Sequence, residues 1–278
     1  MKKSATIGRI LLIFIAIFGI AIMTYLVVLH YSPEKGSFCD LGEGLSCDLV
    51  NKSRYAKVFG VPISALGLIY FLSVLWVAVF RYHARNLFRV AFASLVFLGP
   101  SLYLSYIEFF VIENICVLCE TSKVLIVAVF VISLIAMRPV RFDFRMVNSA
   151  ILLALVFVGV TYLAQQAGAV PSGTYDTFAQ CLYEKGVREY GSKGCSACAR
   201  QRELFGDSHK YVQEIECDPR YSNSQVERCV AKNIERTPTW ILEDAEGDEI
   251  KRIPSGIASL EELAEFSGCP LIKDEKNK

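Results

Sequence analysis

Five long apolar segments constrain the fold of this chain more than any other feature of its sequence. Hydrophobic residues make up 53% of its 278 residues, which is a large share for a soluble domain. Each segment is close to the ~20 residues that an α-helix needs to cross a bilayer. The segments are Ile10–Leu29, Pro62–Phe80, Val90–Phe110, Cys116–Met137 and Met146–Ala164. The first is too long for a signal peptide and no cleavage site follows it, so we expect five transmembrane helices.

Basic residues near the ends of these segments predict an orientation. They are in excess at the start of the chain and in the links at 81–89 and 138–145, but not in the other connections. Cytoplasmic connections carry such an excess of Lys and Arg. The N-terminus and both links are therefore predicted to be cytoplasmic, in an inner (cytoplasmic) membrane. Everything after Ala164 then lies outside, in a periplasmic or other extracytoplasmic space.

Ten cysteines follow the same asymmetry. In the predicted topology none falls in a cytoplasmic link, and all lie outside or at the outer membrane face, where disulfides persist. This placement favours redox chemistry over a cytosolic metal site, and no metal is predicted. The ten are Cys39, Cys47, Cys116, Cys119, Cys181, Cys195, Cys198, Cys217, Cys229 and Cys269.

A short linker divides the chain. Residues 165–174, "QQAGAVPSGT", have the glycine, proline and small residues of a tether, and a polar segment with interleaved helix and strand patterns follows. The predicted fold class is a membrane all-α four-helix bundle plus a fifth linking transmembrane helix, then an extracytoplasmic α/β domain. The predicted domains are residues 1–145 for the bundle, 146–174 for the fifth helix and linker, and 175–278 for the α/β domain.

The α/β segment contains a C-x-x-C motif, "CSAC". Cys195 is expected at the start of a helix, where the helix dipole and free N–H groups lower the pKa of a thiol, and Cys198 follows one turn later. "RTPTWI" comes about forty residues on. Together these motifs resemble the thioredoxin fold over residues 175–278. The resemblance implies that Pro238 is the cis-proline and that Thr237 lies before it, in a loop that faces the substrate. A static disulfide or half of a zinc site is the alternative.

Four further cysteines lie in the same domain. Cys217 and Cys229 close a short loop, and we expect a structural disulfide, with an exchange-active pair as the alternative. Cys181 and Cys269 lie near the two ends of the domain. They either pair or remain free, and the sequence does not decide between the two.

Three motifs follow one another in the apolar part of the chain: "CDLGEGLSCDLV", "FGVPISALGL" and "CVLC". In this order they resemble the vitamin K epoxide reductase family, whose bacterial members carry a tethered thioredoxin-like domain. The resemblance covers essentially the whole chain and identifies residues 1–145 as the transmembrane bundle of that family. A stable structural disulfide that closes the loop is the alternative for Cys39 and Cys47.

The dithiol at the edge of the membrane suggests a lipid-soluble partner. Cys116 and Cys119 are spaced i and i+3, so they share one helix face. The resemblance implies a membrane quinone (ubiquinone, menaquinone or similar) as the electron acceptor. We expect electrons to pass from substrate thiols through Cys195 and Cys198, then Cys39 and Cys47, then Cys116 and Cys119, to that quinone.

Candidate quinone contacts lie near the outer ends of the third and fourth spans and at the entry to the second. They are Phe59, Tyr106, Phe109, Phe110, Leu118, Ser122 and Lys123. Phe59 matches a pocket position of the family, whereas Lys123 stands where the family has a tyrosine. An interfacial belt or core packing is the alternative for the aromatic residues. Glu108 and Glu120 either manage protons or extend to water.

The predicted function is a quinone-coupled thiol oxidase that forms disulfides in exported proteins. Its expected partners are the quinone, exported proteins with reduced cysteines and membrane lipid. The alternatives are an outward-facing disulfide reductase or isomerase, and a membrane-anchored binding module with inert disulfides. The net charge of +1 says nothing about nucleic acid and no basic aromatic patch suggests it, so nucleic acid is not an expected partner. No phosphate loop or Rossmann fingerprint is present, so a nicotinamide or flavin is not expected.

Overall fold

The computed structural model describes residues 2–32, 37–42, 44–137 and 144–274. The chain forms two compact units. The helical unit comprises Met1–Asn51 and Tyr55–Ala167, and the α/β unit comprises Gly168–Lys278 with the short segment Lys52–Arg54. Residues 138–143, which make up most of the predicted second cytoplasmic link, lie outside the described residues. The domain boundaries after residues 145 and 174 remain predictions.

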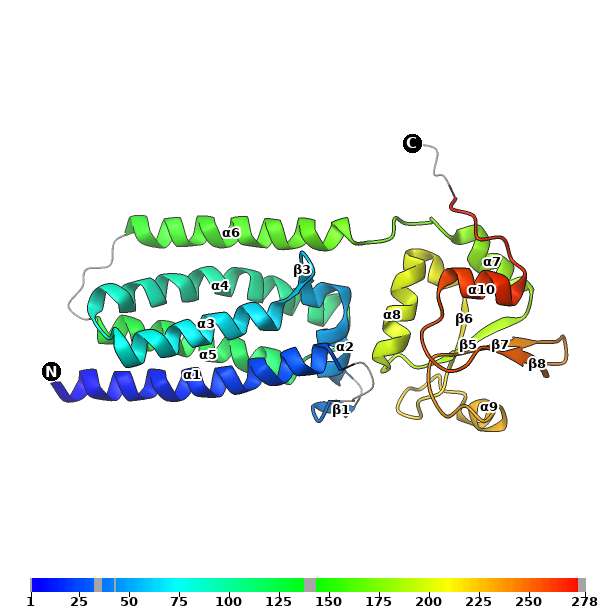
Figure 1. The fold of residues 1–278 in the computed structure, drawn as a ribbon, viewed down its shortest axis with the longest axis horizontal. Helices are drawn as coiled ribbons and strands as arrows, with labels where there is room; N and C mark the ends of the chain where they lie inside the picture. The colour runs from blue at the N-terminus through cyan, green and yellow to red at the C-terminus, as the bar shows by residue number, and fades with distance from the viewer. Residues whose placement is uncertain (1, 33–36, 43, 138–143, 275–278) are drawn as a thin grey trace. The chain divides into compact units, whose positions relative to one another are not determined.

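Among the described residues, five helices of the first unit are long and apolar enough to cross a membrane, as predicted. Helix α1 packs against α3 and α5, and α4 packs against α5 and α6 (Figure 1). The helices are α1 (Lys2–His30), α3 (Ile63–Phe80), α4 (Ala84–Phe110), α5 (Val117–Ala136) and α6 (Phe144–Ala167).

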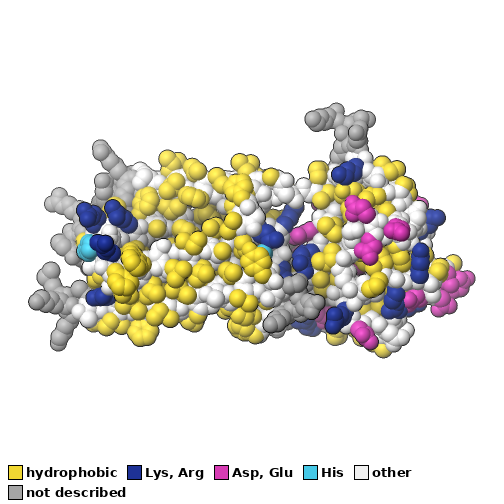
Figure 2. All heavy atoms as spheres, in the orientation of Figure 1, with side chains coloured by type: hydrophobic (Ala, Val, Ile, Leu, Met, Phe, Trp, Pro, Cys, Tyr) yellow, Lys and Arg dark blue, Asp and Glu magenta, His cyan; other side chains and the backbone are white. Residues whose placement is uncertain are grey.

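Close packing between α1 and α3 depends on small residues. A Cβ atom at Gly19 would lie 2.5 Å from the Phe71 ring, and one at Gly67 would lie 2.6 Å from Met23 Sδ. Interfaces between membrane helices use such residues because apolar side chains gain little by leaving lipid. The outer faces of the helices remain apolar (Figure 2). Lys and Arg side chains gather at one end of the helical unit, where α1 begins and α3 leads to α4 (Figure 2).

The segment between α1 and α3 folds into short elements that shape a cap at the end of the bundle. Phe59 and Gly60 form the two-residue turn of a hairpin, with φ values of 49° and 80°. Positive φ at both positions is typical of a type I′ turn. Pro62 then caps the start of α3. The elements are β1 (Asp40–Gly42), β2 (Leu45–Ser46), α2 (Cys47–Lys52), η1 (Arg54–Ala56), β3 (Lys57–Val58) and β4 (Val61–Pro62).

The second unit is a four-stranded sheet with helices on both faces, a thioredoxin-like α/β arrangement. Its strand order is β6-β5-β7-β8, with β5 parallel to β6 and antiparallel to β7. Trp240 packs with α7, α8 and α10, whereas the next residue, Ile241, packs with α9 on the other face. The elements are α7 (Asp176–Glu184), β5 (Val187–Gly191), α8 (Ser196–Phe205), η2 (Gly206–Tyr211), β6 (Gln213–Glu216), α9 (Val226–Ala231), β7 (Thr239–Glu243), β8 (Glu249–Arg252) and α10 (Leu260–Ser267).

Candidate active site

The first predicted redox element is the cap at the end of the helix bundle. Cys39 and Cys47 form a disulfide, with 5.7 Å between their Cα atoms, and Cys47 is the first residue of α2. Two hydrogen bonds fix α2 to the end of α1. His30 Nδ1 lies 2.6 Å from the Asn51 carbonyl oxygen, and Asn51 Nδ2 donates to the Leu26 carbonyl at 2.7 Å. The disulfide is therefore held at a defined place on the bundle.

The second redox element is the start of α5. Cys116 is the N-cap residue, and its sulfur accepts a hydrogen bond from the Cys119 N–H at 3.2 Å. The two cysteines form a disulfide whose Cα atoms are 5.2 Å apart. Cys116 is fully buried, whereas Cys119 is only partly buried. The sulfur at the N-cap lies where N–H groups stabilise a thiolate.

The fold brings these two disulfides into one core. Gly44, which lies between Cys39 and Cys47 in sequence, accepts a hydrogen bond at 2.9 Å from the Ile115 N–H, directly before Cys116. Cys39, Cys47 and Cys116 belong to one buried cluster, and Cys119 packs against it. Four of the six predicted relay cysteines are therefore members of a single packed region.

A largely buried polar network contacts the backbone of Cys116. The Cys116 N–H donates to Glu108 Oε2 at 2.9 Å. Lys123 Nζ donates to Ser105 Oγ at 2.7 Å, to Glu108 Oε1 at 3.3 Å and to Glu120 Oε1 at 2.5 Å. An ammonium group has three N–H donors, so these acceptors occupy all of them. Sequence reasoning considered both glutamates and the lysine, but it missed Ser105, whose contact depends on the register of α4 against α5.

The predicted quinone contacts fall into two groups. Leu118 packs against the core cluster, and Ser122 is buried and donates to the Cys119 carbonyl at 2.7 Å. Together with Lys123, they lie on the first two turns of α5 beside the disulfide. The aromatic side chains Phe59, Tyr106, Phe109 and Phe110 are exposed on the outside of the unit. Their assignment to a quinone site remains a prediction.

The third redox element is the dithiol of the α/β unit. Cys195 caps α8 and accepts a hydrogen bond from the Cys198 N–H at 3.2 Å, and its sulfur lies 3.5 Å from the Thr237 carbonyl oxygen. The Thr237–Pro238 peptide bond is cis. Hydrogen bonding from the Cys198 thiol, then from Thr237 and backbone N–H groups, lowers the pKa of Cys195 to about 6 despite its burial. Burial, and then the proximity of Cys195, raises the pKa of Cys198.

This difference in pKa predicts a selective reaction. In the reduced protein, the rate of Cys195 alkylation by iodoacetamide should reach half of its maximum near pH 6, because the thiolate is the reacting form. Cys198 should remain unlabelled beyond its ordinary pKa of 9.0. Cys198→Ala removes the main hydrogen bond to Cys195 and should move the profile to higher pH. Mass spectrometry of labelled peptides measures both, and a wild-type profile centred near pH 9 would contradict the assignment.

Sequence reasoning missed a buried acid–base pair beneath the dithiol. Glu189 is on the central strand β5 and is fully buried, and its Oε2 lies 2.9 Å from His209 Nε2. Burial raises the pKa of Glu189, and its charge contributes to the raised pKa of Cys198. His209 lies 20 positions from Glu189 along the chain, so no local motif links the two residues. The sequence signal that could have revealed this pair is the acidic residue inside the strand "VREYG".

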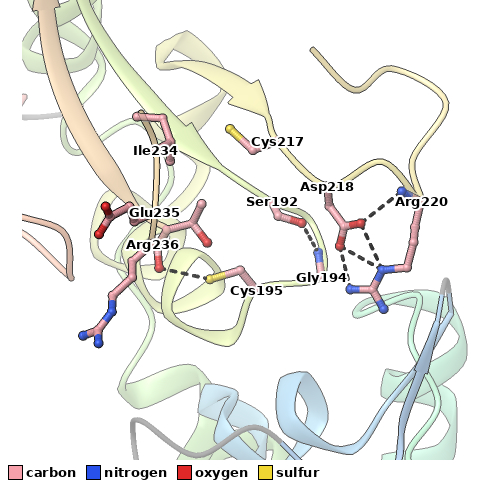
Figure 3. Close-up of a pocket in the computed structure, with 10 residues that line it drawn as sticks. Ser192, Gly194, Cys195, Cys217, Asp218, Arg220, Ile234, Glu235 and Arg236 are labelled. Atoms are coloured by element: carbon pink, nitrogen blue, oxygen red, sulfur yellow. Dashed lines mark hydrogen bonds and ion pairs between the residues drawn. The ribbon is translucent and has the colours of Figure 1, made fainter. Parts of the chain in front are cut away.

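A cavity of about 350 Å³ opens beside Cys195 (Figure 3). It is lined by backbone and side chains from three segments around the dithiol, so a substrate segment can approach Cys195 there. The lining residues are Ser192, Gly194, Cys195, Cys217, Asp218, Arg220, Ile234, Glu235, Arg236 and Thr237. Asp218 and Arg220 form an ion pair at 2.6 Å on one wall.

Two more disulfides complete the α/β unit. Cys217 and Cys229 are paired with their Cα atoms 5.7 Å apart, and Cys217 lines the cavity beside Cys195. A structural role for this pair, with exchange as the alternative, stays a prediction. Cys181 and Cys269, which the sequence left undecided, form a disulfide that joins α7 to the chain after α10, with 6.0 Å between their Cα atoms.

The chain is similar in sequence to a known family and to known proteins. The sequence model of the Vitamin K epoxide reductase family matches residues 10–134. Thiol-disulfide oxidoreductase LTO1 from Arabidopsis thaliana is 27% identical over 292 residues, which cover 93% of this chain and 74% of that protein. Vitamin K epoxide reductase complex subunit 1 from Mus musculus is 26% identical over 134 residues, which cover 41% of this chain and 81% of that protein.

A thioredoxin-like dithiol joined to a disulfide-bearing bundle of membrane helices defines a membrane-bound thiol–disulfide oxidoreductase. Residues 10–134 of the chain form a domain of the Vitamin K epoxide reductase family. The resemblance and the fold class predicted from the sequence are thereby confirmed.

Proposed function

We propose that this oxidoreductase is a quinone-coupled thiol oxidase that forms disulfides in exported proteins. The placement of the Cys116–Cys119 disulfide carries the proposal, because it caps α5 at the beginning of a helix able to span the membrane. Thiols there are within reach of a lipid-soluble partner. The quinone, when bound, supplies a two-electron acceptor. The name of the mouse relative, which refers to vitamin K epoxide, supports this chemical class.

The residues beside the disulfide fit an apolar ring better than a ligand held by strong hydrogen bonds. Leu118 offers an apolar surface next to Cys119, and the exposed rings of Tyr106, Phe109 and Phe110 give the outside of α4 an aromatic surface in lipid. Lys123 is a poor donor for a quinone carbonyl because its three N–H groups are engaged. In this proposal Lys123 supports the dithiol rather than the ligand.

The proposed electron path has three dithiols. Substrate thiols reduce Cys195–Cys198, which reduces Cys39–Cys47, which in turn reduces Cys116–Cys119. Each transfer is a thiolate attack on a disulfide sulfur. The shared core cluster of the loop and membrane disulfides supports the second transfer. We place this path on the outer side of an inner membrane, with the N-terminus in the cytoplasm, because basic side chains gather at the opposite end of the helices (Figure 2).

The low pKa of Cys195 favours the oxidising direction. A stabilised thiolate makes the reduced form of a thioredoxin-like dithiol more stable, and therefore makes its disulfide a stronger oxidant. The same thiolate is a good leaving group when a substrate disulfide closes. An outward-facing reductase or isomerase would instead need electrons delivered to this pair from within the membrane. An inert binding module would need neither a stabilised thiolate nor a supply of electrons.

Thiol counting tests the proposal. The purified, fully reduced protein is incubated without oxygen, with or without a short-chain ubiquinone analogue, and its free thiols are then counted by mass after alkylation. We expect the quinone to remove two thiols for each quinol formed, because closing one disulfide releases two electrons. Thiol counts that do not depend on quinone would refute the proposal and would favour the inert module.

A further inference from the structure

The network around Glu108 contains more charge than its structural task requires. Holding the Cys116 N–H takes only one hydrogen-bond acceptor, which an amide could supply. Yet Glu108 and Lys123 are both buried ion-pair partners, and Glu120 adds a second carboxylate. Removing an ion from water costs several kcal/mol, so a second carboxylate beside one ammonium group costs more free energy than an uncharged acceptor would.

The net charge of this network allows it to take up one proton. Two carboxylates and one ammonium sum to one negative charge, and one added proton makes the group neutral, which a low dielectric favours. The charged groups that act on Glu108 among the described residues are Lys123 and Glu120. The Glu120 side chain is 32% exposed, and it also accepts from Ser105 Oγ at 2.9 Å. The network therefore joins the buried Cys116 to the surface of the unit.

We propose that Glu108 accepts the proton of the Cys116 thiol when the Cys116–Cys119 disulfide closes, and that Lys123 and Glu120 balance and release that proton. Glu108 is a positioning and proton-holding residue, anchored on the backbone of the cysteine that must become a thiolate. The inference rests on the proposed function in one respect only, that this pair cycles between disulfide and dithiol.

The closing step can be isolated without a quinone. Cys119 is the more exposed thiol of the reduced pair, so glutathione disulfide should form a mixed disulfide there. The Cys116 sulfur then attacks the Cys119 sulfur, the bond to glutathione breaks, and glutathione leaves with the bonding electron pair. The Cys116 proton passes to Glu108, and glutathione takes up a proton from water. No other oxidant is needed, and the electrons balance within the exchange.

The experiment measures glutathione release from that mixed disulfide as a function of pH in the full-length protein in detergent. Glu108→Gln keeps an acceptor for the Cys116 N–H but cannot hold the proton. We expect release about 10²-fold slower at neutral pH, the usual contribution of a general base. The rate should then rise about tenfold for each pH unit as solvent replaces the base. Glu108→Asp should recover part of the rate. Thr121→Ala should match wild type, because Thr121 lies on α5 and its hydroxyl donates to the Val117 carbonyl at 2.8 Å rather than to the network.

Several results would overturn the inference. Wild-type speed in Glu108→Gln would do so, and so would a loss of equal size at every pH, which is the signature of a structural role. If Glu108→Gln does not fold, Glu120→Gln decides. Losing the neighbouring negative charge makes Glu108 a weaker base, so release must slow at neutral pH and recover as the pH rises. A wild-type pair that cannot be reduced also overturns it. A wild-type protein that closes rapidly yet transfers nothing to quinone refutes the proposed function and leaves the role of Glu108 standing.

Discussion

Replacing Cys119 with alanine is expected to abolish quinone reduction, even when dithiothreitol is abundant. Cys119 is the more exposed sulfur of the pair at the start of α5, and the proposed path has no other exit to the membrane. A small dithiol can reduce the earlier pairs, but the electrons then stop at Cys116. We expect quinol formation to fall to the rate of the reaction without enzyme. Absorbance of the quinone analogue in the presence of purified protein measures this.

Cys195→Ala is the matched control for this experiment. It removes the reactive thiol of the α/β unit and leaves the helical unit intact, so dithiothreitol should bypass it and quinone reduction should continue. The same variant should fail when a reduced protein is the electron donor, because in the proposed path a protein donor enters the relay only through Cys195, which lines the cavity of the α/β unit. Equal loss in both variants with dithiothreitol would contradict the proposed order of the dithiols.

Features that depend on local sequence were predictable. A run of about twenty apolar residues specifies a membrane helix wherever the rest of the chain lies. A cysteine after a strand and a glycine, followed by a second cysteine at i+3, specifies a helix that begins at the first thiol, as Cys195 and Cys198 show. The Phe59-Gly60 turn before Pro62 is equally local. In each case neighbouring residues alone determine the structure.

Features that depend on contacts between distant residues were not predictable. Cys181 and Cys269 pair across 88 residues, and their approach depends on how α10 returns to α7. Glu189 in a strand has the pattern of a solvent-facing residue until the sheet is covered on both faces. Ser105 meets Lys123 only because α4 and α5 pack in one particular register. A single sequence therefore specifies helices and strands better than it specifies which distant residues contact one another.

Replacing Cys39 with alanine should trap a disulfide between Cys47 and Cys116. A transfer between the two pairs requires a thiolate of the cap to attack a sulfur at the start of α5, through a mixed disulfide. Such a bond needs Cα atoms about 4.4–6.8 Å apart. Cys47 and Cys116 are both fully buried in the same cluster, and the Gly44–Ile115 hydrogen bond holds their segments together. We therefore assign the attack on the membrane pair to Cys47.

In the proposed path Cys39 resolves this intermediate, so its loss should make the intermediate accumulate. Peptide mapping under non-reducing conditions, after acid quenching and alkylation, should show Cys47 joined to Cys116 and a single label on Cys119. Cys47→Ala should show no bond between the cap and Cys116. If Cys47 is found joined to Cys195 instead, the two cap thiols act in the reverse order and their shuttle role stands. If Cys47 is free in every redox state, electrons do not pass through the cap, and the relay fails as a mechanism.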